Sequence, residues 1–348
     1  HAPDPFLAFE VGGASRAVLS SLEISRGERD SRFDEVLSLE EIITQMEGGE
    51  SLAGRILGLA KQYGASRLLL PEDFPARTAF ELREEGALPV EFLDRPVCRG
   101  RLQKSESEQE SIRRVNTIIS GAYSLVERLI GESTVKDGIL TWGGEVLTSE
   151  KVRSLIAIHC LEQGCIASGT IVAGGDQGCD PHEQGSGPLP ANELIIVDIF
   201  PRDEQSGYFG DMTRTYLKGV ANDDQRRLVA VVREAQKRAI DSLAAGVDGK
   251  AIHDKVIEYF EQSGFSTGRD DSGYYGFFHG TGHGLGLEIH EEPRVSRQTY
   301  LLETGMVTTV EPGLYYRGLG GCRIEDVVCI QPGGVVMLSD HPYDWEIE

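Results

Sequence analysis

The segment HGTGHGLGLEIHE, residues 279–291, contains three of the chain's eight histidines, His279, His283 and His290, within twelve residues. Four of the residues between them are glycines, and a glycine lets the backbone approach a ligand closely because it has no Cβ. The segment therefore predicts a site in which imidazole groups face a ligand held near the backbone.

Three familiar motifs do not account for this region. A dinucleotide-binding G-x-G-x-x-G fingerprint fails because Leu285 or Leu287 stands where the third glycine is required. A zinc-binding H-E-x-x-H helix fails because Arg294 occupies the position of the second histidine. The string GFSTG, residues 264–268, matches the G-x-S-x-G of serine hydrolases, but it follows a predicted helix instead of joining a strand to a helix. A serine hydrolase is therefore the weaker alternative.

Four carboxylates lie on or beside apolar strands elsewhere in the sequence. Asp198 follows the apolar run ELIIV, and Asp211 precedes MTRTYL after a turn-rich stretch, so a hairpin would place the two side by side. Glu311 follows TTV, and Glu325 lies in RIEDVVCI, where burying an acid is costly without a partner. The partner of each acid is either a cation or a neighbouring basic side chain.

Ordinary explanations stay open for each acid alone, because the aspartates could be loop-edge residues and the glutamates could pair with Arg317 or Arg323. Taken together, four carboxylates balance the charge of two divalent cations, and an imidazole completes the donor set. Oxygen ligands with one imidazole and no thiolate favour Mn²⁺, Co²⁺, Fe²⁺ or Zn²⁺ over copper. Two such ions sharing a water would support hydrolysis.

The composition excludes several classes of protein. The 348 residues include 34 Lys+Arg and 56 Asp+Glu, a net charge of −22, which argues against nucleic-acid binding and against docking on an anionic membrane. No apolar stretch approaches the roughly 18–20 residues of a membrane span, and no basic-then-apolar leader is recognisable. The six cysteines form no C-x-x-C pair, so we expect reduced thiols, no structural zinc and a cytoplasmic protein.

Residue periodicity predicts two domains, 1–104 and 105–348. The first alternates strands with helices, which indicates an α/β unit with strands at 6–11, 67–71 and 89–94 and helices at 38–46 and 52–64. A long amphipathic helix over 102–130 opens the second. The remainder predicts an α+β domain with helices at 148–163, 222–245 and 250–262 and strands at 169–175, 193–200, 212–219, 305–313, 321–330 and 335–339.

In combination these motifs resemble the creatinase, prolidase and methionine aminopeptidase superfamily. HGTGHGLGLEIHE is similar to the proline-peptidase signature, and IIVDIF, GYFGDMTRTYLKG, GMVTTVEPGLYY and RIEDVV match the flanking blocks in order. The resemblance covers about residues 105–340 and extends weakly to the first domain, which we expect to lack its first strand. It implies an α+β pita-bread catalytic domain preceded by a smaller α/β creatinase-type domain.

The resemblance also implies two divalent metal ions, with Mn²⁺ preferred over Co²⁺, Zn²⁺ or Fe²⁺. Carried over position by position, the ligands are Asp198, Asp211, His283, Glu311 and Glu325. Asp211 and Glu325 bridge both ions, and Asp198 holds one of them. His283 and Glu311 hold the other, and Glu311 also acts as the general base.

Further residues match the substrate side of such sites. The resemblance implies that His182 and His290 stabilise the carbonyl region of the scissile bond, and that His279 belongs to the same pocket. Arg323, two residues before a predicted ligand, would orient the site. One departure is Phe200, which stands with a longer loop where the family has a small residue and a shorter turn.

The resemblance implies a dinuclear metallo-exopeptidase that cleaves Xaa-Pro bonds. A dipeptidase (prolidase) is preferred over an aminopeptidase P acting on longer peptides because the chain is compact. A dipeptidase must capture the free carboxylate of proline, for which Arg294 and Arg297 are candidates, although both could equally be surface arginines. A non-catalytic peptide-binding relative is a remote alternative, because such relatives lose metal ligands. We expect a homodimer that binds peptides with proline at the second position.

Overall fold

The computed structural model describes residues 4–86, 88–93, 98–271 and 273–348. The chain divides into two compact units, His1–Arg99 and Gly100–Glu348. The domain boundary expected at residue 104 stays a prediction, and the end of the strand predicted over 89–94 lies outside the described residues. In the described part of the chain, no helix combines the length and apolar character that crossing a membrane requires.

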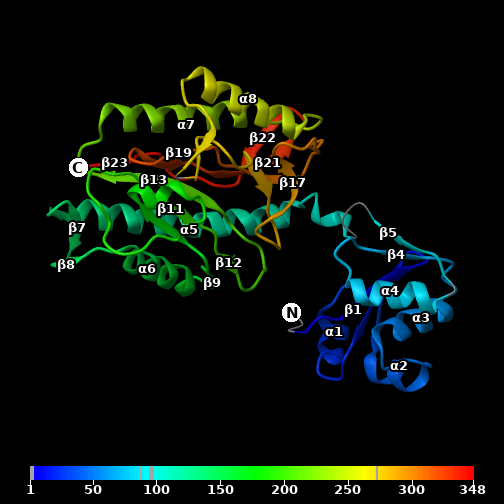
Figure 1. Ribbon diagram of the computed structural model, residues 1–348. Helices are drawn as coiled ribbons and strands as arrows, with labels where there is room; N and C mark the ends of the chain where they lie inside the picture. The colour runs from blue at the N-terminus through cyan, green and yellow to red at the C-terminus, as the bar shows by residue number, and fades with distance from the viewer. Residues whose placement is uncertain (1–3, 87, 94–97, 272) are drawn as a thin grey trace. The chain divides into compact units, whose positions relative to one another are not determined.

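The first unit is an α/β arrangement, as predicted (Figure 1). Strands β1, β2 and β3 form one sheet in which β2 pairs antiparallel with β1 and parallel with β3, while β4 and β5 form a parallel pair. The helices α3 and α4 pack on a small core that includes Ile56 and Leu82. The elements are β1 (Leu7–Val11), β2 (Ala14–Leu19), α1 (Ile24–Asp30), β3 (Glu35–Ser38), α2 (Leu39–Gln45), α3 (Leu52–Gln62), β4 (Leu68–Leu70), α4 (Ala76–Glu85) and β5 (Val90–Phe92).

The second unit contains most of the secondary structure. Its helices are α5 (Glu106–Glu132), α6 (Ser149–Glu162), α7 (Asp223–Ser242) and α8 (Gly249–Gln262), with a short 3₁₀ helix η2 (Gly175–Cys179). A further 3₁₀ helix, η1 (Arg99–Arg101), includes the last residue of the first unit and the first two of the second. Its strands are β6 (Thr134–Lys136), β7 (Ile139–Trp142), β8 (Glu145–Val146), β9 (Cys165–Ile166), β10 (Ile171–Gly174), β11 (Ile195–Ile199), β12 (Arg202–Asp203), β13 (Met212–Lys218), β14 (Gly268–Asp270), β15 (Gly273–Tyr275), β16 (Gly282–Gly284), β17 (Glu291–Val295), β18 (Val307–Val310), β19 (Gly313–Tyr316), β20 (Gly320–Arg323), β21 (Asp326–Gln331), β22 (Gly334–Met337) and β23 (Glu346–Ile347).

The larger sheets of the second unit lie between two layers of helices. The order is β10-β11-β13-β23 in one sheet and β17-β16-β18-β21-β22 in another. Helices α5 and α6 cover one side and α7 and α8 the other (Figure 1). Two large apolar clusters fill these layers, one under α5 and α6 and one under α7 and α8. The predicted α+β class of this unit is confirmed, and the strands between the helices are where the candidate site residues lie.

Helix α5 begins later in the chain than the sequence predicts. The amphipathic pattern predicts a helix from residue 102, but α5 begins at Glu106. Ser105 caps the helix, with the Ser105 and Glu108 side chains bonding to each other's backbone N–H. Lys104 instead donates its backbone N–H to the Gly305 carbonyl, so the preceding residues are held by a neighbouring segment. Helix α7 also begins with a capping box, formed by Asn222 and Gln225.

Candidate metal centre

His283 occupies the middle of β16 because the glycines on either side admit other backbone segments. A Cβ on Gly282 would lie 1.9 Å from the Thr309 carbonyl oxygen, and one on Gly284 would lie 2.2 Å from the Glu292 carbonyl oxygen. Only glycine fits such close approaches. The alternation of glycine and histidine therefore packs β16 tightly between β17 and β18, with the imidazole buried at the centre.

Glu311 and Glu325 lie opposite each other at a break in one long hairpin. Strand β18 pairs with β21, and beyond the break β19 pairs with β20. The sequence predicted a single strand over 321–330, but the chain passes from one strand pair to another at Ile324 and Glu325. The backbone N–H of Glu325 donates to the Thr213 carbonyl at 3.0 Å. The break thus turns both glutamates out of regular sheet positions.

The predicted pairing of the strands that carry Asp198 and Asp211 is present. Strand β11 runs antiparallel to β13, with Asp198 opposite Thr213, and Asp211 directly precedes β13. The backbone N–H of Asp211 donates to the Asn116 side-chain oxygen at 3.0 Å, which fixes the start of β13 against helix α5. Both aspartates are buried.

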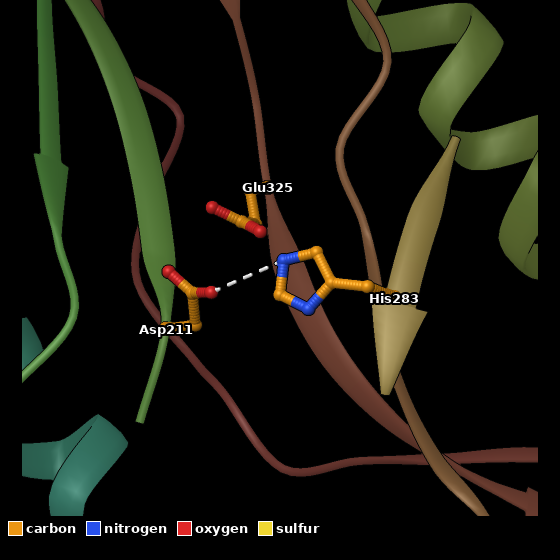
Figure 2. A group of neighbouring side chains, drawn as sticks. All are labelled: Asp211, His283 and Glu325. Atoms are coloured by element: carbon orange, nitrogen blue, oxygen red, sulfur yellow. Dashed lines mark ion pairs between the residues drawn. The ribbon is translucent and has the colours of Figure 1, made fainter. Parts of the chain in front are cut away.

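Asp211 directly before β13, His283 in β16 and Glu325 just before β21 converge in space (Figure 2). One potential ligand atom of each lies within 4.8 Å of the others. The Nε2 atom of His283 lies 3.6 Å from Oδ2 of Asp211 and 3.5 Å from Oε1 of Glu311. The structure therefore brings three of the predicted carboxylate ligands, Asp211, Glu311 and Glu325, close to the imidazole of the fourth ligand, His283.

Burial and mutual repulsion perturb the acids of this cluster. Burial raises the pKa of Asp211 and of Glu325 well above the ordinary carboxylate range, and the charges of the neighbouring acids raise both further. Burial likewise raises the pKa of Glu311 to about 7, although the charge of Arg323 opposes the shift. Burial lowers the pKa of His283 to about 3, so its imidazole is neutral. Such a group of acids around a neutral imidazole suits a site that receives cations.

Two atoms of the predicted ligands, Nε2 of His283 and Oδ1 of Asp198, are suited to binding a metal ion. Nδ1 of His283 lies 3.1 Å from the Gly284 carbonyl oxygen, and because a carbonyl only accepts, Nδ1 carries the hydrogen. The lone pair on Nε2 then faces the oxygens of Asp211 and Glu311, an arrangement that is unfavourable while these acids are charged and that a cation between them would relieve. Oδ1 of Asp198 is buried and has no hydrogen-bond partner among the described residues. The donor set of carboxylates and one imidazole therefore fits divalent ions of the Mn²⁺ or Zn²⁺ type.

Asp198 is held by a buried arginine, Arg323. Nη2 of Arg323 donates to Oδ2 of Asp198 at 2.7 Å, and both side chains are buried. Nη1 of Arg323 lies 3.0 Å from the Tyr315 hydroxyl, which is also 2.9 Å from Nε2 of His279. Among the described residues, Arg323 thus forms its ion pair with Asp198. The alternative expectation, that Arg323 pairs with Glu311 or Glu325, is not met there.

The other predicted substrate residues differ in whether they contact the predicted metal ligands. The ring of His290 packs edge-on against that of His283, with centroids 4.4 Å apart. Arg294 on β17 is the cross-strand partner of His283, and its charge lowers the pKa of His290 after the larger effect of burial. His182 is exposed in the loop after η2, and its charge contributes to lowering the pKa of His279 and of His290. Arg297 is exposed, and its guanidinium lies 3.4 Å from the Phe278 carbonyl oxygen.

The loop between Asp198 and Asp211 is ordered, contrary to its appearance as a plain turn-rich stretch. Its short strand β12 pairs with β9, and Asp203 forms an ion pair with Arg114 at 2.6 Å. Asp203 also accepts hydrogen bonds from the backbone and side chain of Ser206. Phe200 lies beside Gly169, where an added Cβ would be 3.1 Å from its ring. The longer loop is therefore anchored on the α5 and α6 side.

Two other sequence features take clear positions. Ser266 lies between α8 and β14, so its turn joins a helix to a strand, the reverse of a nucleophile elbow. All six cysteines are free thiols, and all except Cys98 are buried.

Several residues around the site were not predicted from the sequence. Tyr315 links His279 to Arg323, as described above. The Tyr123 hydroxyl on α5 lies 3.0 Å from the carbonyl oxygen of Val197 and 2.6 Å from that of Met212, next to both aspartates. The bond between Tyr315 and Arg323 spans 8 residues of sequence, and the other three contacts span 36 to 89, so no local pattern reports those three. A signal was available only in the tyrosine hydroxyls themselves, which need partners when buried.

Comparison with known proteins places the chain in a family. The profile of metallopeptidase family M24 matches residues 110–332. The Xaa-Pro dipeptidase of Pyrococcus furiosus is 38% identical over 191 residues, which cover 54% of this chain and 51% of that protein. The Xaa-Pro dipeptidase of Pyrococcus horikoshii is 31% identical over 263 residues, covering 73% and 72% of the two chains. The chain thus spans about half the length of the first relative and nearly three quarters of the second.

Solved structures support the same architecture. The structure described as Xaa-Pro dipeptidase from Bacillus anthracis superposes with a TM-score of 0.82, covering 100% of this chain and 90% of that one. Its sequence identity is 22%, so the likeness concerns the fold. The pita-bread fold predicted for the second unit, with a smaller unit before it, is confirmed. Given the matched residues and these relatives, the chain belongs to metallopeptidase family M24.

Proposed function

We propose that this chain is an Xaa-Pro dipeptidase that uses two divalent ions held by Asp198, Asp211, His283, Glu311 and Glu325. The observation that carries the proposal is the convergence of Asp211, His283 and Glu325 within one small volume. The names of the two Pyrococcus relatives support the substrate class. Mn²⁺ is the proposed metal. A homodimer in the cytoplasm also stays a prediction.

The proposed reaction divides the work among the side chains of the site. The two ions would supply a nucleophile by lowering the pKa of water, and would neutralise the carboxylates. Glu311, 3.5 Å from the imidazole of His283, accepts the proton of the attacking water. His290 and His182 donate hydrogen bonds to the carbonyl oxygen as negative charge develops on it. Arg323 keeps Asp198 oriented through their 2.7 Å contact.

Arg294 is the proposed carboxylate-binding residue that makes the enzyme a dipeptidase. Its register opposite His283 on neighbouring strands supports this role, because directly opposed residues project from the same face of a sheet. Arg297 is the weaker candidate, since its guanidinium contacts a backbone carbonyl and the side chain is exposed. An arginine can bind a carboxylate through two parallel hydrogen bonds.

We expect Arg294→Met to raise KM for Ala-Pro by about tenfold or more, because a charged hydrogen bond contributes about 1.5–3 kcal/mol. The same variant should barely change KM for Ala-Pro amide, which has no free carboxylate. Arg297→Met is the matched control and should leave both values unchanged. Steady-state kinetics on the two substrates measure the effect. An equal rise for the acid and the amide would exclude Arg294 from carboxylate binding.

A panel of three peptides with added Mn²⁺ tests the substrate class. We expect hydrolysis of Ala-Pro, with Ala-Pro-Ala a poorer substrate and Met-Ala-Ser uncleaved. Cleavage of the tripeptide but not the dipeptide would instead identify an aminopeptidase P. Cleavage of Met-Ala-Ser alone would overturn the proline specificity. Binding of all three without cleavage would favour the non-catalytic alternative.

A further inference from the structure

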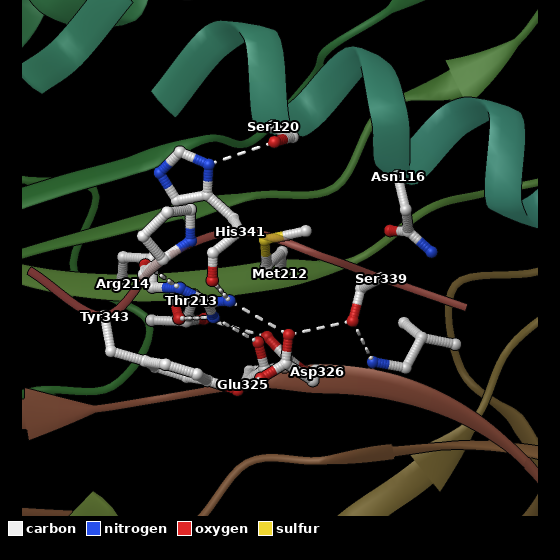
Figure 3. Close-up of polar contacts among 12 residues, drawn as sticks. Asn116, Ser120, Met212, Thr213, Arg214, Glu325, Asp326, Ser339, His341 and Tyr343 are labelled. Carbon is white, nitrogen blue, oxygen red and sulfur yellow. Dashed lines mark hydrogen bonds and ion pairs between the residues drawn. The ribbon is translucent and has the colours of Figure 1, made fainter. Parts of the chain in front are cut away.

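The strand segments that carry the proposed ligands have a second polar face. Thr213 and Glu325 are bridge partners, and the Thr213 hydroxyl donates to Oε2 of Glu325 at 2.8 Å. The next residue of each segment points to the opposite side, because side chains alternate along a strand. There Nη2 of Arg214 lies 2.9 Å from Oδ1 of Asp326 in a buried ion pair (Figure 3). This pair is directly behind Glu325 in sequence and in space.

The carboxylate of Asp326 is fully committed to protein partners. Besides Arg214, it accepts hydrogen bonds from three side chains of two other segments, Ser339 at 2.8 Å, Tyr343 at 2.7 Å and Gln236 of α7 at 2.8 Å. Two donors therefore reach each of its oxygens. A buried carboxylate with four donors has its charge satisfied and its position fixed.

The guanidinium of Arg214 likewise has a hydrogen-bond acceptor for each of its donors. Its five N–H groups all have acceptors, which are the carbonyl oxygens of Thr213, Glu325, His341 and Pro342 and the carboxylate of Asp326. The bond from Nη1 to the Glu325 carbonyl is 2.7 Å. The guanidinium also lies over the ring of Tyr343, 4.5 Å from its centroid. Arg214 thus donates a hydrogen bond to the backbone carbonyl of Glu325, and Thr213 donates one to its carboxylate.

We propose that Arg214 and Asp326 are positioning residues that hold Glu325 ready to bind metal. Neither can shift without leaving a buried charge uncompensated, which is strongly unfavourable. The backbone of Glu325 is therefore fixed before any ion arrives, and less ordering is required on binding. This inference rests on the metal centre proposed above and adds to it a set of residues that do not themselves contact the ions.

The test removes two of the four donors to Asp326 and leaves its ion pair with Arg214 intact. In the double variant Ser339→Ala/Tyr343→Phe, we expect the Kd for Mn²⁺ to rise about tenfold, the lower end of the effects seen when outer partners of metal ligands are lost. Calorimetric titration of metal-free protein with Mn²⁺ alone, without substrate, measures this Kd.

The control variant is Ser133→Ala/Tyr216→Phe. It also removes one buried serine hydroxyl and one buried tyrosine hydroxyl, but these bond to Leu129 and Glu127 instead of Asp326. We expect its Kd to equal that of the unaltered protein. Equal Kd values in the two double variants, whether both normal or both raised, would overturn the positioning role.

Single variants keep the test decisive if a double variant does not fold. Tyr343→Phe should then bind Mn²⁺ more weakly than Tyr216→Phe, and equal binding would overturn the inference. Failure of the unaltered protein to bind Mn²⁺ would reject the metal centre itself, and the positioning role with it. Normal binding by the unaltered protein and by the Asp326-side variant alike would reject only the positioning role.

Discussion

Replacing Glu311 by glutamine is expected to lower kcat on Ala-Pro by at least about 10²-fold, the scale of a lost general base. The amide has nearly the same shape but cannot accept the proton of the attacking water. The side chain lies 3.5 Å from Nε2 of His283, so a larger change would disturb the cluster as well. Steady-state kinetics at saturating Mn²⁺ measure the loss.

Two further measurements distinguish the loss of a general base at Glu311 from the loss of a metal ligand. Metal content, determined on the same sample, shows whether the variant still binds its ions when kcat has fallen. The control is Glu258→Gln on the exposed face of α8, where the carboxylate accepts a hydrogen bond from the neighbouring Gln262. We expect the control to retain full activity. An unimpaired Glu311→Gln enzyme would remove Glu311 from the mechanism.

Asp211→Asn should weaken Mn²⁺ binding by more than about 100-fold, beyond the range for residues that only support a ligand. The same variant should raise the melting temperature of the metal-free protein. Asp211 is buried among the acids Glu325, Asp198 and Glu311, whose charges raise its pKa. Removing one charge relieves this repulsion when no cation is bound. The two expected effects therefore have opposite signs.

Thermal unfolding with and without Mn²⁺ measures both effects. A protein that binds its metal at 100 times Kd gains about 2.7 kcal/mol of stability, and the variant should lose most of that gain. Asp340→Asn is a suitable control, because Asp340 is an exposed acid in the same unit. A variant that is less stable without metal and equally stabilised by it would show that Asp211 is an ordinary structural acid.

The sequence was informative where an element's identity follows from residue spacing. The apolar runs around Asp198, Asp211 and Glu311 predicted strand ends, and β11, the start of β13 and the end of β18 lie there. The glycines around His283 predicted close backbone approach, and Thr309 and Glu292 make it. Such local features depend on a few neighbouring residues, so a single sequence is enough to predict them.

Contacts between distant segments could not be predicted. Asp326 stands beside Glu325 in one apolar run, and strand alternation places the two carboxylates on opposite faces, but nothing in that run identifies their different partners. The partners Thr213 and Arg214 are 112 residues away. The break between β20 and β21 was also missed, because its cause is the pairing of each half with a different strand. Tertiary packing, and not local preference, decides these features.

The most direct test of a metal-dependent Xaa-Pro dipeptidase is hydrolysis of Ala-Pro by protein stripped with a chelator, before and after Mn²⁺ is restored. We expect no detectable hydrolysis by the stripped protein and recovery of activity as Mn²⁺ reaches two ions per chain. Hydrolysis that survives complete removal of metal, or no hydrolysis of Ala-Pro at any Mn²⁺ concentration, would contradict the account.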